Sequence, residues 1–133
     1  MSPVTNSGIS AFGDLVYSVR EPDWIALHAA AGLTEDPSTG LIVGYINQAG
    51  AGDSGNANFV VEVDSGGIVV YRNVGTPDPM ATATDTYGGF EVFHVPTGPA
   101  TLTATDGVVV ITTSVYIYPD TAHLVRAYDY GGN

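Results

Sequence analysis

The sequence has 133 residues, enough for one domain, and its fourteen acidic residues face three arginines and no lysine, for a formal net charge of −11. We expect no binding to nucleic acid or to an anionic membrane face, because both need a basic surface. The chain has no cysteine, which excludes disulfides, thiolate metal sites and cysteine nucleophiles. Seventeen valines and fourteen threonines against six leucines favour strands over helices.

Residues 1–20 are predicted to form an N-terminal arm. The first eleven are rich in Ser, Thr, Asn and Gly, and 12–19 predict a short strand with imperfect alternation. Residues 1–10 show neither the basic segment nor the apolar segment of a signal peptide. The arm has the composition of a segment able to reach a neighbouring molecule.

Residues 21–38 are predicted to hold one short helix and a linker. Glu21-Pro22-Asp23 opens the helix, since proline suits the first helical position and acids suit the positive end of the helix dipole. Trp24 and Leu27 follow at helical spacing, and Gly32 is placed to end the helix. So short a helix needs Trp24 and Leu27 packed on a sheet.

Residues 39–133 are predicted to form a Greek-key β-sandwich of about seven antiparallel strands, because short apolar runs alternate with turn signals. Asp64-Ser65-Gly66-Gly67 is typical of a hairpin turn between two of these strands. No apolar run reaches the ~18 residues that a membrane-spanning helix needs. The predicted strands cover residues 41–46, 59–63, 68–72, 80–86, 90–95, 101–105, 108–118 and 124–130, with a loop at 75–79.

One motif lies in the middle of this region. Asp85 can bond the backbone two residues on, and Gly88 can supply a positive φ. Phe90 then enters the core, while Pro96 and Gly98 set a second turn. The letters Thr84-Asp85-Thr86-Tyr87-Gly88-Gly89-Phe90-Glu91-Val92, followed by Val95-Pro96-Thr97-Gly98, resemble the T-D-x-x-G-x-F and [LV]-P-x-G core of carboxypeptidase-regulatory-like domains.

The resemblance covers about residues 39–128 and implies a transthyretin-like β-sandwich. It further implies a non-catalytic module, structural, adhesive or carbohydrate-associated, in a secreted or cell-surface protein. The double proline usual in that family is Pro96-Thr97 here, and residues 1–38 have no clear counterpart.

Two segments carry the letters of protease active sites. Gly52-Asp53-Ser54-Gly55 repeats the letters around a serine nucleophile, but such an enzyme needs two barrels and a His–Asp pair. Val63-Asp64-Ser65-Gly66 resembles an aspartic-protease loop, for which a homodimer would supply the second carboxylate. Turn formation explains both, so we expect no catalytic residue and no enzyme activity.

Metal binding has two weak candidates. His28, His94 and His123 are isolated in the sequence, which favours partly buried histidines over an intersubunit metal site. Calcium at an aspartate-rich loop is the alternative to plain turn formation, and otherwise no cofactor is expected. The six aspartates in predicted turns are Asp53, Asp64, Asp78, Asp85, Asp106 and Asp120.

Late strands carry tyrosines two residues apart. Tyr116 with Tyr118, and Tyr128 with Tyr130, share a face of their strands. A place in the core or at the rim is the favoured interpretation. A solvent-facing strip would indicate a sugar-stacking surface or a subunit contact.

Our leading hypothesis is an extracellular structural module that assembles with copies of itself. Residues 108–118 are long, apolar and free of charge, and an exposed strand of that kind pairs with other chains. The arm at 1–20 is a further candidate, by adding a strand to a neighbour. The alternatives are a monomeric carbohydrate-binding module and, far behind, an acid-protease dimer using Asp64.

Overall fold

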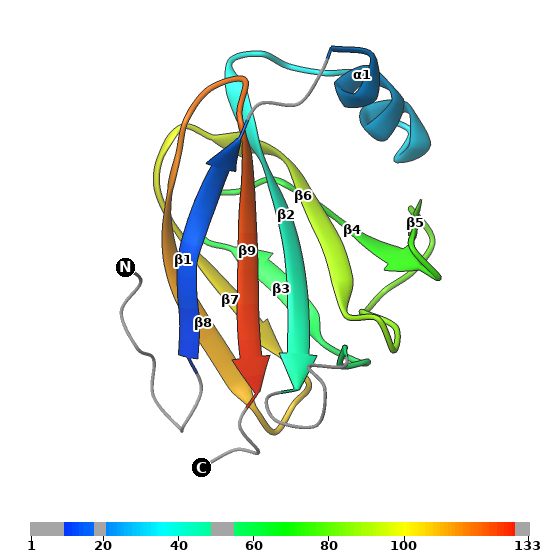
Figure 1. Cartoon of the computed structure of the whole chain (residues 1–133), viewed down its shortest axis with the longest axis vertical. Helices are drawn as coiled ribbons and strands as arrows, with labels where there is room; N and C mark the ends of the chain where they lie inside the picture. Colours follow the sequence, from blue (N-terminus) through cyan, green and yellow to red (C-terminus); the bar gives the residue numbers. More distant parts are fainter. Residues whose placement is uncertain (1–9, 18–20, 49–54, 130–133) are drawn as a thin grey trace.

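The computed structural model describes residues 10–17, 21–48 and 55–129, which form a two-layered β-sandwich with one helix (Figure 1). One sheet has six strands in the order β1-β9-β2-β6-β4-β5, and the other has three in the order β3-β7-β8. The predicted all-β class is therefore confirmed, with nine strands in the described part rather than about seven. The elements are β1 (Ser10–Tyr17), α1 (Glu21–Ala30), β2 (Thr39–Gln48), β3 (Val60–Val63), β4 (Ile68–Asn73), β5 (Thr76–Asp78), β6 (Gly89–Pro96), β7 (Gly98–Thr105), β8 (Val110–Ile117) and β9 (Ala122–Asp129).

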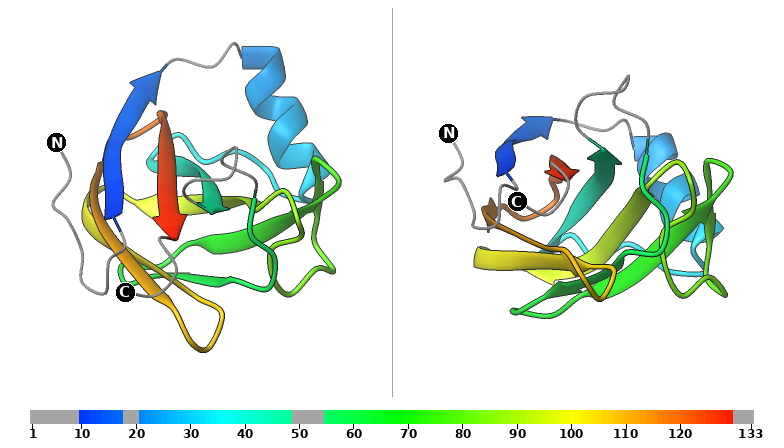
Figure 2. Two further views of the ribbon diagram at one scale, coloured as in Figure 1. Left: turned by 60° about the horizontal axis from the view of Figure 1, so that its bottom comes forward. Right: turned by 90° about the horizontal axis from the view of Figure 1, so that it is seen from below.

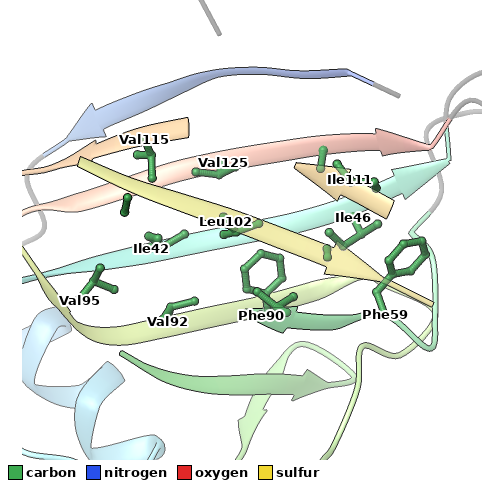
Figure 3. Packing of buried hydrophobic residues seen from close by; sticks show 14 of the residues in the cluster. Ile42, Ile46, Phe59, Phe90, Val92, Val95, Leu102, Ile111, Val115 and Val125 are labelled. Atoms are coloured by element: carbon green, nitrogen blue, oxygen red, sulfur yellow. The ribbon is translucent and has the colours of Figure 1, made fainter. Parts of the chain in front are cut away.

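The main core lies between the two sheets (Figure 3). Alternate residues of β7 point into it, which is the pattern that the period of two predicted, whereas in β6 an irregular register places Phe90, Val92 and Val95 there. Phe90 fills the centre from β6, and Leu102 faces it from β7. Burial of branched and aromatic side chains at ~25 cal/mol per Å² is the main stabilising contribution to such a sandwich. The residues of this core that Figure 3 labels are Ile42, Ile46, Phe59, Phe90, Val92, Val95, Leu102, Ile111, Val115 and Val125.

The strand pairing departs from the sequence prediction in two respects. β2 and β9 run parallel, whereas we expected antiparallel strands throughout. The expected hairpin at Asp64–Gly67 is also wrong, because β3 pairs with β7 and β4 pairs with β6 and β5. The turn carries the chain from one sheet to the other, with positive φ at Gly66 and Gly67.

Two segments between β4 and β6 exchange their predicted roles. The predicted loop contains the three-residue strand β5, which pairs with β4. The predicted strand at 80–86 is not a strand. Thr84 instead joins the loop before β3, with its hydroxyl bonded to the amide of Phe59 and the carbonyl of Asn56. A buried side-chain bond thus replaces the ladder that the alternating threonines suggested.

The strand of the predicted arm belongs to this chain's own sandwich. β1 pairs antiparallel with β9 and forms one edge of the six-stranded sheet. It also lies close to β8 without pairing with it (Figure 1). The arm's strand therefore closes this side of the sandwich in its own chain.

Helix α1 covers one end of the outward face of the larger sheet. Figure 2 shows α1 and the three-stranded sheet on opposite sides of β2 and β6. Leu27 packs against the second apolar cluster, which includes Leu41 and Phe93, as predicted, and the side chain of Trp24 lies outside the described part. Gly32 has a φ of 77° directly after the helix, where a left-handed residue ends it.

Candidate functional site

A row of four residues crosses the uncovered end of the same outward face. Tyr45 on β2 lies between Gly89 on β6 and Arg126 on β9 in the strand register. Arg72 on β4 comes next to Gly89, since its neighbour Tyr71 pairs with Phe90. The guanidinium carbon of Arg126 lies 5.1 Å from the centre of the Tyr45 ring, which is a cation–π contact.

Gly89 has no side chain, and this leaves space between its neighbours in the row. A Cβ at Gly89 would lie 3.1 Å from Cδ of Arg72 and 3.4 Å from Cε1 of Tyr45. The missing side chain therefore lets Arg72 and Tyr45 lean toward each other over the backbone of β6. Glycine in a strand often marks such a close approach.

Above Gly89 the surface is hollowed into a pocket of about 260 Å³, which we name the Tyr45–Arg72 pocket. Its walls come from three segments far apart in the sequence, on β2, on the end of β4 and on the loop before β6. Aromatic rings, one arginine and bare backbone line it together, a mixture typical of ligand sites. The lining residues are Tyr45, Arg72, Val74, Gly75, Tyr87 and Gly89.

Asp85 joins the two loops that wall this pocket. Its Oδ1 accepts a hydrogen bond from the amide of Tyr87 at 2.9 Å, and its Oδ2 accepts one from the amide of Val74 at 2.7 Å. The first bond closes an Asx turn on its own loop, and the second reaches the turn after β4. One carboxylate therefore sets the distance between Val74 and Tyr87 across the pocket.

Arg72 is held by a buried carboxylate. Its Nε and Nη2 bond to Oε2 of Glu91, and its Nη1 donates to the carbonyl of Gly75 at 2.8 Å. Glu91 is fully buried between Val43 and Val70, its partners in the strand register. Burial raises the pKa of Glu91 above its usual 4.5, while the hydrogen bond and charge of Arg72 oppose that rise.

The other residues of the sequence motif build the frame behind the pocket. Gly88 has a φ of 74°, and a Cβ there would overlap the carbonyl oxygen of Ile46. Phe90 is buried in the main core. Pro96 ends β6, and Gly98, with a φ of 114°, begins β7 in the other sheet. These residues of the motif therefore have structural roles, and two others, Tyr87 and Gly89, line the pocket.

The protease-like segments have structural surroundings where they are described. Asp64 is exposed and accepts a hydrogen bond from the amide of Thr101 at 2.8 Å, which ties the inter-sheet turn to β7. Residues 52–54 of the serine-like segment lie outside the described residues.

Two of the three histidines meet beneath α1, which their sequence positions did not suggest. The rings of His28 and His94 stack with centroids 5.9 Å apart, and His28 also meets Phe93 edge-on at 4.8 Å. Nε2 of His94 bonds to the carbonyl of Thr34 at 2.8 Å. His123 is buried elsewhere, under the ring of Tyr118.

Aspartate loops are tied by backbone amides. Asp106 accepts from the amides of Val108 and Val109, and Asp78 accepts from that of Met80. The amide hydrogen bonds hold the pKa of Asp106 below its usual 3.8. Asp120 has a φ of 54°, and Asp53 lies outside the described residues. Within the described part of the chain, no three acidic or histidine side chains are grouped as a metal site would require.

Tyr116 near the end of β8 and Tyr118 directly after it are about half exposed, which excludes the core and leaves the expected rim position. Tyr116 and Tyr118 are 53% and 49% exposed, and their ring centroids are 5.1 Å apart. Tyr128 is half-buried on the outward face of the larger sheet, and Tyr130 lies outside the described residues.

Comparison with known proteins adds no family. No protein-family model, curated protein or solved structure matches this chain. Over the described ranges, no helix has the length and apolar character needed to cross a bilayer. The case for a function therefore depends on the surfaces of the molecule itself.

Sequence reasoning did not find the Tyr45–Arg72 pocket. Its arginine and tyrosine come from strands whose order in the sheet is not written in the local pattern. The sequence did contain one indication of such a site. Arginine is scarce in this chain, and two of its three arginines lie on predicted strands.

Proposed function

We propose that this chain is a non-catalytic structural module that associates with copies of itself through β8. The observation that carries the proposal is the chemistry of this terminal strand of the smaller sheet. Neither β7 nor β8 contains a charged residue, although the chain as a whole carries −11. Four large apolar side chains on β8 and its flanks are exposed, namely Val108 at 89%, Val110 at 44%, Tyr116 at 53% and Tyr118 at 49%.

The rest of this face supports the same proposal. The outward side chains of β7 are Thr101, Thr103 and Thr105, each partly exposed beside its neighbour on β8. Strands β7 and β8 offer methyl groups and hydroxyls on this face, and the exposed Glu62 of β3 borders it beside Thr103. A second copy is the occupant that suits it, because the exposed valines and tyrosines of β8 and its flanks can pack against their counterparts without burying a charge of β8.

Sedimentation velocity of the whole chain over a wide concentration range tests this proposal. We expect the average mass to rise with concentration, and to rise further in salt, which screens repulsion between acidic copies. Tyr116→Lys should keep the protein monomeric, whereas Met80→Lys, at an exposed loop position away from β8, should leave association unchanged. A wild-type chain that stays monomeric throughout, or associates as well with Tyr116→Lys, would contradict the proposal.

The resemblance to carboxypeptidase-regulatory-like domains belongs to the same proposal. We infer from the motif at 84–98 a module of a secreted or cell-surface protein, and association between copies suits such a setting.

Carbohydrate binding is the second candidate, favoured by the exposed pair Tyr116 and Tyr118. Adjacent aromatic rings at a surface can stack on sugar rings. Affinity electrophoresis in gels that contain neutral polysaccharides tests it, with retardation expected for the wild type and lost in Tyr118→Ser.

A further inference from the structure

Positive charge in the described part of the chain is concentrated at one place. Arg72 and Arg126 both lie in the row that crosses Gly89 and Tyr45. Arg20 lies outside the described residues, and the chain has no lysine. Glu91 compensates Arg72, whereas Arg126 forms no ion pair with any described residue. Within the described side chains, which leave out those of β1 and of Asp129, Arg126 therefore adds a positive charge beside Tyr45.

Arg72 retains hydrogen-bonding capacity toward a ligand. A guanidinium has five N–H donors, and three of those of Arg72 point to Glu91 and Gly75. The other two, one on Nη1 and one on Nη2, have no acceptor among the described residues. Arginine N–H groups are donors that a carboxylate can accept in a bidentate way.

The walls of the pocket suit a ring. Tyr45 and Tyr87 line it with Val74, while Gly89 leaves the floor flat. Its volume of about 260 Å³ leaves room for a substituted six-membered ring. Tyrosine faces pack well on either aromatic rings or the C–H faces of sugar rings.

We propose that the Tyr45–Arg72 pocket binds a carboxylate carried on a six-membered ring. The carboxylate accepts the two remaining N–H groups of Arg72, and the ring packs between Tyr45 and Tyr87. The positive charge of Arg126, beside Tyr45, attracts the anion at short range. Repulsion from the acidic remainder of the chain is screened beyond a Debye length of about 8 Å at physiological salt.

The ion pair between Arg72 and the buried Glu91 contributes to the proposed binding site. It fixes the guanidinium in place before the ligand arrives, so that little side-chain entropy is lost on binding. Asp85 likewise fixes Val74 and Tyr87 across the opening. The site lies on the larger sheet, away from β8, so the proposal does not depend on self-association.

Titration of the ¹⁵N-labelled whole chain with four probes tests the proposal and separates two sources of the acid. Glucuronate and benzoate carry the carboxylate, and glucose and benzyl alcohol are their neutral counterparts. We expect saturable chemical-shift changes at the amides of residues 72–75 and 85–89 with one or both acids. The acid should bind roughly tenfold more tightly than its neutral counterpart, or more. Stronger binding of glucuronate assigns the site to acidic sugars, and stronger binding of benzoate assigns it to aromatic acids. Equal binding of acid and neutral probes, or no saturable shift with either acid, overturns the proposal.

Two variants and a control keep the test specific. Arg126→Gln should weaken acid binding about fivefold, in line with the loss of one exposed charge interaction. Gly89→Ala narrows the floor and should weaken both probe classes. Met80→Ala, at an exposed position outside the pocket, should change neither. The amide spectrum of each variant shows whether it folds, and folded Arg126→Gln and Gly89→Ala proteins that bind as tightly as the wild type would overturn the proposal.

Discussion

The carboxylate of Asp85 accepts a hydrogen bond from the amide of Val74 at 2.7 Å and thereby joins two loops eleven residues apart. The same side chain bonds the amide of Tyr87 within its own loop. A residue that the sequence marked only as a turn former therefore also links the end of β4 to the segment before β6.

Asp85→Ala should lower the free energy of unfolding by about 1–2 kcal/mol, because it removes two hydrogen bonds to a charged acceptor at a partly exposed site. Urea denaturation measures this loss, and hydrogen exchange at Val74 and Tyr87 should become faster. Asp78→Ala is the matched control, since its carboxylate accepts a hydrogen bond from the amide of Met80 two residues on and does not join two loops among the described residues. If both variants lose the same stability and neither changes exchange at Val74, Asp85 does not join the loops.

Arg72→Met should destabilise the fold by about 3 kcal/mol at neutral pH, because it leaves ionised Glu91 buried without its partner. Burial already raises the pKa of Glu91 above 4.5, and loss of Arg72 should raise it further. The folded state then takes up a proton at a higher pH than the unfolded state does. The destabilisation relative to wild type is therefore largest above the folded pKa and should shrink as the pH falls toward 4.5.

Denaturation of wild type and Arg72→Met at several pH values measures that difference. Arg126→Met is the control, because Arg126 has no ion pair with a described carboxylate, and its effect should not change with pH. A constant loss for Arg72→Met at all pH values would show that Glu91 does not depend on Arg72.

Asp106→Asn should weaken the fold at neutral pH and matter less in acid. The amides of Val109 and Val108 hold the pKa of Asp106 below 3.8, so its ionised form stabilises the β7–β8 turn above that pH. This stabilisation is lost as the pH falls through the lowered pKa. Thermal unfolding of the two proteins at several pH values should converge as the pH falls below 3.8, and a difference that stays constant with pH would contradict this role of Asp106.

Local patterns in the sequence predicted the strands but not their partners. The period of two in residues 41–46 and 90–95 follows directly from one face meeting the core, so β2 and β6 were foreseeable. Asp64-Ser65-Gly66-Gly67 shows the limit of such reasoning. Its glycines report that the chain reverses, but not that Val61 and Val70 enter different clusters on different sheets.

The pocket was hidden for the same reason. Tyr45, Arg72 and Arg126 are separated by more than 25 positions, and only the order β9-β2-β6-β4 brings them into one row. The turn around Asp85 could be predicted from the sequence because its geometry is local. The hydrogen bond from the Val74 amide to Asp85 could not be predicted, since it depends on where β4 ends.

Gly88 and Gly32 offer a matched test of how much the space around a glycine matters. Both have a φ near 75°, but a Cβ at Gly88 would overlap the carbonyl oxygen of Ile46, whereas nothing lies near one at Gly32. Gly32→Ala should cost about 1 kcal/mol, the strain of a left-handed residue alone. Gly88→Ala should cost about 4 kcal/mol or more, because β2 must move away and its bond from the Ile46 amide to the Gly88 carbonyl must weaken. Chemical denaturation of both variants measures the difference, and equal losses would mean that the approach of Gly88 to β2 does not constrain the fold.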